Sequence, residues 1–462
     1  MVVLLEYLIF IVLFICYINA PQQISASYLS LVLVLAFASY ILLWVDKKTR
    51  LLYKDNFISN TNIFLLMFAI VAFQFPLDFC IGNNGINYMQ YFYSYDIINK
   101  STTFNALCFV SFIIGIIKTD ITKSVDFSNL AIHSNIKTIP VKYILLIMYF
   151  LWIGFIVFLN RSYINGGHGT VLINPISVAC YGYFFRLNII YLAILLYNQR
   201  TQKRKTIKQI YFEIPKLYWI IILISILLFF FANNRVYVLY LVGPVIFYVL
   251  AVGRFKTKPL QSFLIIMAVG IFFTFFKLVG IEGIFNEDNL SLDNFDNYDR
   301  FSSISPFTSE LAASILSDSA LFNTWNTAGV VLPGSTLVYG VLRTFSGLVP
   351  MFYSLTGLND ITYNPAVFIT VLMGADYGLG SSITGDLIVS VGMVGTIVIM
   401  FFFGKLCKYG DLNIFWGSTN IKGLLIGMSI ATQITFVARA SLCDVISTIL
   451  FCLLFFSIYK RF

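Results

Sequence analysis

The run TGDLIVSVGMVGTIVIMFFFG, residues 384–404, contains a single charged side chain, that of Asp386. A helix crosses the hydrocarbon core of a bilayer with about 20 mostly apolar residues, so this run predicts a membrane-spanning helix. Similar runs occur along most of the chain, and we predict about twelve spans in all. The others lie roughly at 2–19, 27–45, 62–81, 103–118, 141–159, 177–197, 215–232, 236–252, 259–279, 421–437 and 442–459.

The composition of the 462-residue chain agrees with these runs. Hydrophobic residues make up 59% of it and charged residues 11%, whereas a soluble domain carries about 25% charged residues. A chain this apolar cannot cover itself with polar surface in water. We therefore predict an all-α polytopic integral membrane protein, and we exclude a soluble domain, disorder, fibrous structure and a secreted disulfide scaffold.

The positive charges predict the orientation of the spans, because Lys and Arg collect in the cytoplasmic loops of membrane proteins. When the N-terminus is placed inside, every inner loop is basic, and these loops hold most of the 30 Lys and Arg residues. Both termini are therefore predicted to be cytoplasmic, and the net charge of +9 reflects topology rather than a nucleic-acid partner. The first run lacks a basic segment before it and predicts a span rather than a cleavable signal peptide.

The sequence carries no signature of a metal site or a nucleotide-driven pump. The two His residues, His133 and His168, fall on opposite sides of the membrane in this topology, and no CxxC occurs. The GxxxxGK loop of ATP-driven proteins does not occur either. We therefore expect neither a metal nor a cofactor.

One connection is much longer than the others. It covers residues 281–383, between nine predicted spans in 1–280 and the last three in 384–462. The predicted topology places it outside, and its acidic residues outnumber its two basic ones, Arg300 and Arg343. Long structureless loops are uncommon, so a loop of this length predicts either function or disorder, and this one is too apolar for disorder.

Two parts of this loop have a recognisable pattern. Apolar residues at helical spacing after Pro306 predict a helix over 305–327. The amphiphilic stretch 330–355 predicts a segment that lies in the membrane interface or re-enters the membrane. We expect a small folded cap against the outer membrane face; a plain tether is the alternative.

Outside the inner loops, most positive residues are Arg rather than Lys. The planar fork of an Arg side chain suits phosphate, and a charge at membrane depth is costly and usually marks a functional path. The candidates are Arg161, Arg186, Arg235, Arg300, Arg343 and Arg439. Together they predict a site for a lipid-linked phosphate or pyrophosphate, whereas a sugar nucleotide would be met on the cytoplasmic side.

Several of these arginines also have a structural interpretation. Arg186, within the sixth predicted span, could form a buried pair with an acid such as Asp78. Arg235 and Arg439 occupy outer turns between spans, where snorkelling of the side chain to the interface would explain them equally well.

The acids that would complete such a site lie in GADYGLGSSITGD, residues 374–386. Asp376 or Asp386 could act as general base for a sugar hydroxyl. Ser381 and Ser382 could bind a ligand through their hydroxyls or cap the following helix. The alternative is that Asp386 pairs with an arginine and the Gly-Ser turn only leads the chain into the membrane.

Residues 377–404, YGLGSSITGDLIVSVGMVGTIVIMFFFG, resemble the O-antigen polymerase family, often called Wzy. Its members commonly have a Gly-Leu-Gly-Ser-Ser turn, here 378–382, followed by an acid and a glycine, here Asp386 and Gly392. The usual acid is Glu, so Asp386 is a departure that keeps the charge and shortens the reach. Residues 186–200, RLNIIYLAILLYNQR, are also similar to the family, as is the large loop before the last three spans.

The resemblance implies a glycosyltransferase of the bacterial inner membrane that polymerises O-antigen repeat units on the periplasmic face. The growing glycan would leave its undecaprenyl pyrophosphate carrier and pass to a new carrier-linked repeat unit. The implied partners are this carrier-linked oligosaccharide, membrane lipid and a regulator of chain length. The expected substrate-binding residues are Arg186, Arg235, Arg439, Arg343, Arg300, Arg161, Ser381 and Ser382, and the expected catalytic residues are Asp386 and Asp376.

Two other functions fit the same outline. A flippase of the same lipid-linked oligosaccharide would need no large folded outer loop, and an internal repeat would favour it; the sequence shows none. An O-antigen ligase, which transfers the finished chain to a lipid core, shares the chemistry and stays open.

Overall fold

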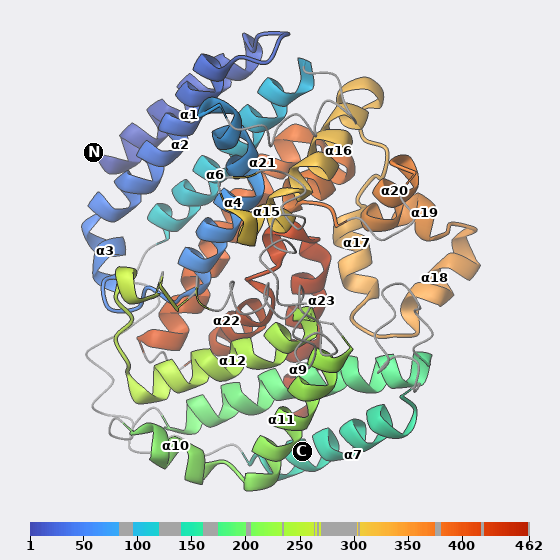
Figure 1. Cartoon of the computed structure of the whole chain (residues 1–462). Helices are drawn as coiled ribbons and strands as arrows, with labels where there is room; N and C mark the ends of the chain where they lie inside the picture. The colour runs from blue at the N-terminus through green and yellow to red at the C-terminus, as the bar shows by residue number, and fades with distance from the viewer. Residues whose placement is uncertain are drawn as a thin grey trace, which may run out of the picture.

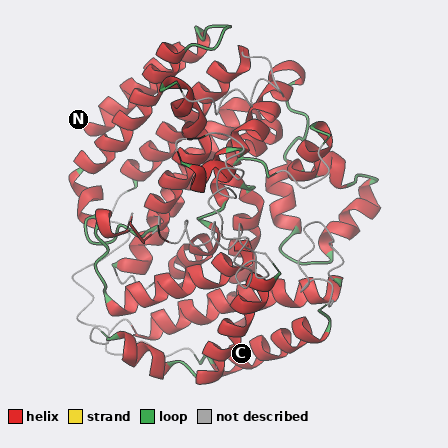
Figure 2. Ribbon diagram, in the orientation of Figure 1, coloured by secondary structure: helices red, strands yellow, loops and turns green. Residues whose placement is uncertain are grey.

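We describe a computed structural model of the chain. The described residues are 1–82, 96–119, 140–159, 174–199, 205–232, 235–262, 305–374, 380–416 and 420–460, together with 264, 265, 268 and 303. Over these residues the secondary structure is helical, and the β-type pairing is one isolated bridge between Asn56 and Thr257 (Figure 2). The all-α prediction is confirmed for this part of the chain.

Among the described residues, seven helices are long and apolar enough to cross a membrane. They are α2 (Ala26–Val45), α4 (Asn60–Cys80), α6 (Asp96–Lys118), α9 (Pro175–Gln199), α12 (Arg235–Gly253), α21 (Ile383–Phe415) and α23 (Leu442–Tyr459). An eighth candidate is the pair α10 (Ile207–Glu213) and α11 (Lys216–Phe231), which is bent by 101°. The chain is therefore a multi-pass membrane protein.

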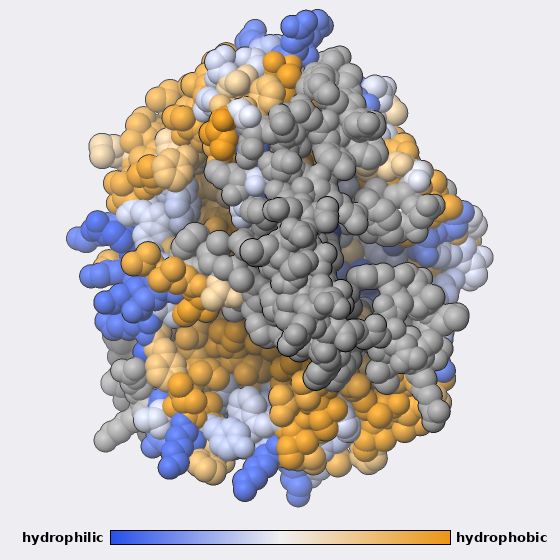
Figure 3. All heavy atoms as spheres, in the orientation of Figure 1, coloured by the Kyte–Doolittle hydropathy of each residue, from blue (hydrophilic) through white to orange (hydrophobic). Residues whose placement is uncertain are grey.

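Two shorter apolar helices, α1 (Val2–Ile18) and α7 (Lys142–Val157), correspond to further predicted spans. Both expose large apolar side chains, such as Leu4 and Ile11 on α1 and Phe150 and Ile153 on α7. The face in Figure 3 carries broad apolar areas at its upper left and along its lower part. Such surface suits contact with lipid rather than with water.

Many of the helices are capped by a polar side chain just before their first residue. Ser25, Ser59 and Ser441 accept hydrogen bonds from the first backbone amides of α2, α4 and α23. Thr206 and Gln209 form a reciprocal capping box at α10. These caps satisfy amides that a helix itself leaves unpaired, which explains why the helices start where they do.

The long helices pack in two groups (Figure 1). One contains α1, α2, α4, α6 and α21, and the other contains α7, α9, α11, α12 and α22 (Ile421–Gln433). Helix α22 packs against α21 and so connects the two groups, and α23 packs against α22 and α9. The closest contact is between α6 and α21, where a Cβ on Gly115 would lie 2.0 Å from Phe401 O and one on Gly404 2.1 Å from Phe112 O. Only glycine lets the two backbones approach this closely.

Helix α21 differs from the prediction of a span over 384–404, because it continues to Phe415 and is broken once. The break is at Gly392, whose φ of 72° and ψ of 177° lie outside the helical region and are accessible mainly to glycine. The segment before the break, from Ile383 to Ser390, is buried throughout. The acid-bearing first turns of α21 therefore lie inside the protein.

Between residues 305 and 372 the predicted long loop forms a series of short helices joined by turns. The segment predicted as one helix over 305–327 forms two, α15 (Pro306–Ala312) and α16 (Ser314–Ala328), and the stretch 330–355 forms α17 (Ser335–Leu342) and α18 (Leu348–Thr356). Two short helices follow, α19 (Asp360–Tyr363) and α20 (Pro365–Leu372). Since α16 packs against α21 and α17 against α23, this part is folded onto the spans rather than tethered beside them.

Candidate functional site

The candidate residues that the structure describes gather where α9, α17, α21 and α23 meet. The 3₁₀ turn η4 (Val437–Arg439) leads into α23 at the same place. In Figure 1, α23 lies near the centre between the two groups of helices, with α17 and α18 to its right. Helices from the N-terminal, loop and C-terminal parts of the sequence thus supply one site.

Arg186 of α9 holds the chain just after α17. Its guanidinium donates to the backbone oxygens of Thr344 at 2.7 Å and Arg343 at 3.0 Å, and to Ser447 Oγ of α23 at 3.2 Å. It also lies 5.4 Å from the ring centroid of Phe451. The predicted alternative of a pair with Asp78 is wrong within the described residues, because these neutral oxygens are the partners of the guanidinium. Asp78 instead accepts a hydrogen bond from Ser303 at 2.5 Å.

Arg343, at the end of α17, forms an ion pair with Asp444 in the first turn of α23. The side chain of Arg343 is 43% exposed and that of Asp444 28%. The Asp444 carboxylate raises the pKa of Arg343 above its ordinary value, so the guanidinium stays charged. Because Arg186 binds the backbone oxygen of Arg343, two cations lie close to a single described carboxylate, an arrangement that favours an anion.

Asp386, in the first turn of α21, is completely buried. Thr336 of α17 donates to one of its carboxylate oxygens at 2.8 Å, and Ser441 donates to the other. Ser441 is half-buried and also accepts the backbone amide of Cys443 at 3.1 Å, as the cap of α23. The partners of Asp386 are thus hydroxyls, so the expected alternative of pairing with an arginine is not found among the described residues.

The structure adds a second buried acid, Asp318 of α16, which the sequence suggested only as one of many loop acids. Its carboxylate accepts hydrogen bonds from Ser382, from Thr384 at 3.0 Å and from Asn105 Nδ2 at 2.7 Å. Burial raises the pKa of Asp318, and these hydrogen bonds partly oppose the shift. The signal in the sequence was an acid within an otherwise apolar helical run, ILSDSALF at 315–322.

The paired serines before α21 have different surroundings. Ser382 caps α21 by accepting the amide of Gly385 at 2.9 Å, and its hydroxyl donates to Asp318. Ser381 is 1% exposed, and its hydroxyl has no hydrogen-bond partner among the described residues. Ser382 is thus structural, whereas the hydroxyl of Ser381 is enclosed and has no structural hydrogen bond among the described residues.

Arg439 lies against the glycine turn. A Cβ on Gly380 would come 3.2 Å from the backbone oxygen of Arg439 and 3.7 Å from its Nε. The absence of a side chain at Gly380 therefore makes room for Arg439 beside the start of α21. Arg161, Arg300 and Asp376 lie outside the described residues, as does the side chain of Arg235, whose backbone begins α12.

Within the described chain, no group of three His, Cys, Asp or Glu side chains could hold a metal ion. The chemistry that these residues offer is binding of an anion by guanidinium groups and acceptance of a proton by a carboxylate. Comparisons of the chain with models of protein families, with curated proteins and with solved structures give no match.

Proposed function

We propose that the chain is a glycosyltransferase of the O-antigen polymerase family, which transfers a growing glycan from undecaprenyl pyrophosphate to a carrier-linked repeat unit. The observation that carries the proposal is the junction of α17 and α23, where the Arg186–Arg343–Asp444 cluster lies near the carboxylate of Asp386. A pyrophosphate leaving group and a hydroxyl nucleophile require these two kinds of group together.

The proposed topology has about twelve spans in the bacterial inner membrane, with both termini cytoplasmic and the loop 281–383 periplasmic. The basic loops between the predicted spans support this orientation. The site would then face the periplasm, where carrier-linked repeat units are joined.

The arginines would bind the pyrophosphate of the donor. The Arg343–Asp444 pair is partly exposed, so an incoming pyrophosphate can take the place of Asp444 at small cost. Arg186 is held by neutral oxygens, which leaves its charge to stabilise the leaving group. The bond between the anomeric carbon and the pyrophosphate oxygen breaks, and undecaprenyl pyrophosphate leaves.

Asp386 would take the proton of the acceptor hydroxyl through Ser441. Since Asp386 is completely buried and Ser441 is half-buried, the acceptor can reach the serine but not the carboxylate. The acceptor passes its proton to Ser441 Oγ as Ser441 passes its own proton to Asp386. The acceptor oxygen then bonds to the anomeric carbon, and the proton stays on Asp386 until it is released.

Deletion of the chain from the producing bacterium tests this proposal. Loss of a polymerase leaves single repeat units on the lipid core, which appear as one short band when the lipopolysaccharide is separated on a gel. Loss of a flippase or a ligase leaves no repeat unit on the core. Long-chain polymer in the deletion strain would refute the proposal, and a bare core would favour one of these alternatives.

A further inference from the structure

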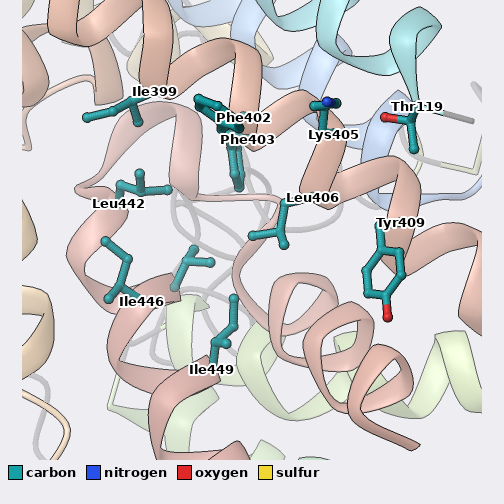
Figure 4. Close-up of a pocket in the computed structure, with 11 residues that line it drawn as sticks. Thr119, Ile399, Phe402, Phe403, Lys405, Leu406, Tyr409, Leu442, Ile446 and Ile449 are labelled. Atoms are coloured by element: carbon teal, nitrogen blue, oxygen red, sulfur yellow. The ribbon is translucent and has the colours of Figure 1, made fainter. Parts of the chain in front are cut away.

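An apolar cavity of ≈ 500 Å³ lies between the second half of α21 and α23 (Figure 4). Its apolar walls include Ile399, Phe402 and Leu406 of α21, and Leu442, Ile446 and Ile449 of α23. The polar side chains Thr119, Lys405 and Tyr409 lie together on one side of it (Figure 4). A volume of this order is typical of a ligand pocket, for which about 300–1,000 Å³ is usual.

The cavity is long rather than round. With a rise of about 1.5 Å per residue, its lining from Ile399 to Tyr409 extends about 15 Å along α21, and that from Leu442 to Ile449 about 10 Å along α23. The lining residues recur at helical spacing, so one continuous face of each helix lines the cavity. This shape suits a flexible hydrocarbon chain rather than a compact ligand.

One end of the cavity lies next to the polar cluster along α23. Leu442 and Val445 line it, and each directly follows a residue of the site, Ser441 and Asp444. Ile446, also in the lining, touches α17, because a Cβ on Gly340 would lie 3.0 Å from the Cβ of Ile446. Helix α23 thus turns one face to the cavity and another to the site.

The charge at this end indicates the kind of head group that the chain would carry. Arg186 and Arg343 lie there with Asp444 as the carboxylate partner of Arg343. An excess of guanidinium groups favours an anionic head, with phosphate oxygens matching their paired donors. The occupant is therefore an amphiphile with a long apolar tail and a phosphate-bearing head.

We propose that this cavity binds the polyprenyl tail of a lipid pyrophosphate whose head lies at Arg186 and Arg343. The inference rests on the proposed function, which requires such a carrier, and it assigns the carrier a place in this chain. A single cavity of ≈ 500 Å³ suits one unbranched run of isoprene units, whereas a phospholipid would need room for two acyl chains. Binding orients the pyrophosphate toward Ser441 and Asp386, because tail and head are fixed by neighbouring turns of α23.

The test fills the cavity and compares a long with a short tail. The filling variants are Leu406→Trp and Ile449→Trp, which place a large side chain in the cavity. The matched controls are Val398→Trp and Leu454→Trp, at apolar positions on the same two helices that are 46% and 47% exposed. Binding of undecaprenyl pyrophosphate and of geranyl pyrophosphate to the purified full chain in detergent would be measured by native mass spectrometry. We expect the filling variants to bind undecaprenyl pyrophosphate at least about tenfold more weakly, because several methylene groups of its tail can no longer be buried.

Geranyl pyrophosphate should bind to all five proteins with similar affinity, since its short tail stays near Leu442. This binding also reports that each variant is folded. Equal binding of undecaprenyl pyrophosphate by wild-type and filling variants would overturn the inference, as would a wild-type chain that binds none. If filling displaces phosphatidylglycerol but not the carrier, the cavity is a phospholipid site and the inference is again wrong. The proposed function is decided separately, by the deletion phenotype.

Discussion

Two sets of polar contacts link α17 to the start of α23, and they differ in nearly every physical respect. At the end of α17, Arg343 pairs with Asp444 in partly exposed surroundings, with side chains 43% and 28% exposed. At its start, Thr336 shares the buried carboxylate of Asp386 with Ser441. The exposed pair can exchange its partner for a ligand at a cost of about 0–1 kcal/mol. The buried carboxylate cannot lose its hydroxyls so cheaply, since an unsatisfied buried polar group costs about 1–3 kcal/mol.

Charge alone therefore does not decide what a residue does at this junction. Arg343 is charged, accessible and exchangeable, which suits substrate binding. Asp386 is enclosed and fully hydrogen-bonded, which suits a proton acceptor that acts through Ser441 and also fixes three helices.

The largest effect is expected for Asp386→Asn. The amide has nearly the same shape and can still meet the hydroxyls of Thr336 and Ser441, so the fold should survive, but it cannot take up a proton. Chain growth should fall by about 10²–10⁴-fold, the usual contribution of a general base. Polymer length on gels, normalised to the amount of protein in the membrane, measures this. Asp55→Asn, at an exposed pair with Lys256, is the control, and normal growth in Asp386→Asn would remove the base from the mechanism.

A somewhat smaller loss is expected for Arg186→Lys. A lysine keeps the charge but cannot bridge Thr344, Arg343 and Ser447 with a planar fork. We expect chain growth to fall by about 10²–10³-fold, as when a preorganised donor to a leaving anion is removed. Arg50→Lys, an exposed position on α3 (Lys47–Tyr53), serves as control in the same gel assay. Polymer of wild-type length from Arg186→Lys would show that a positive charge at this position supports chain growth without the planar guanidinium.

Arg343→Lys should have a modest effect. The lysine can still pair with Asp444, and the pair is partly exposed, so the stability of the protein should change by no more than about 1 kcal/mol. Carrier binding should weaken about tenfold, because the paired donors of the guanidinium are lost. Thermal unfolding and binding of undecaprenyl pyrophosphate check the two parts, with Lys256→Arg as the control. Unfolding of the variant at much lower temperature would place Arg343 among the structural residues instead.

The smallest effect concerns the pH dependence of stability. Since burial raises the pKa of Asp318 above 3.8, its stabilising contribution is complete below 3.8 and is lost as the pH rises through the raised value. Asp318→Asn cannot titrate, so the unfolding temperature of this variant should fall less over that pH window. Unfolding temperatures of both proteins from pH 4 upward measure this. If the unfolding temperatures of the wild type and Asp318→Asn change with pH in the same way, Asp318 does not contribute to the pH dependence of stability. The control variant Asp55→Asn should show the wild-type pH dependence.

Much of the fold could be predicted from the sequence, because a bilayer selects helices by length and hydropathy. The tenth predicted span illustrates the limit of this argument. Hydropathy predicted a start at residue 384, and the helix begins one residue earlier, at Ile383. Hydropathy did not predict that the helix breaks at Gly392 and continues to Phe415. Trp325 and Val330, from a distant part of the chain, lie against Gly392, and the local sequence does not reveal that contact.

The candidate site was predicted in part. Arg186, Arg343, Arg439 and Asp386 were selected because charged residues are costly at membrane depth, and the structure brings them to one junction. Their partners could not be predicted. Thr336, Ser441 and Ser447 are ordinary hydroxyl residues in the sequence, and only the packing of α17 and α23 makes them ligands of Asp386 and Arg186.

The sequence by itself determined that this protein is helical, lies in a membrane and carries few but costly charges, because these properties follow from composition and from spacing along one chain. The tertiary structure alone decided which charges pair, which acids are enclosed and where an apolar cavity opens beside them. Those outcomes depend on contacts between residues hundreds of positions apart, such as Arg186 and Ser447, and local pattern does not record them.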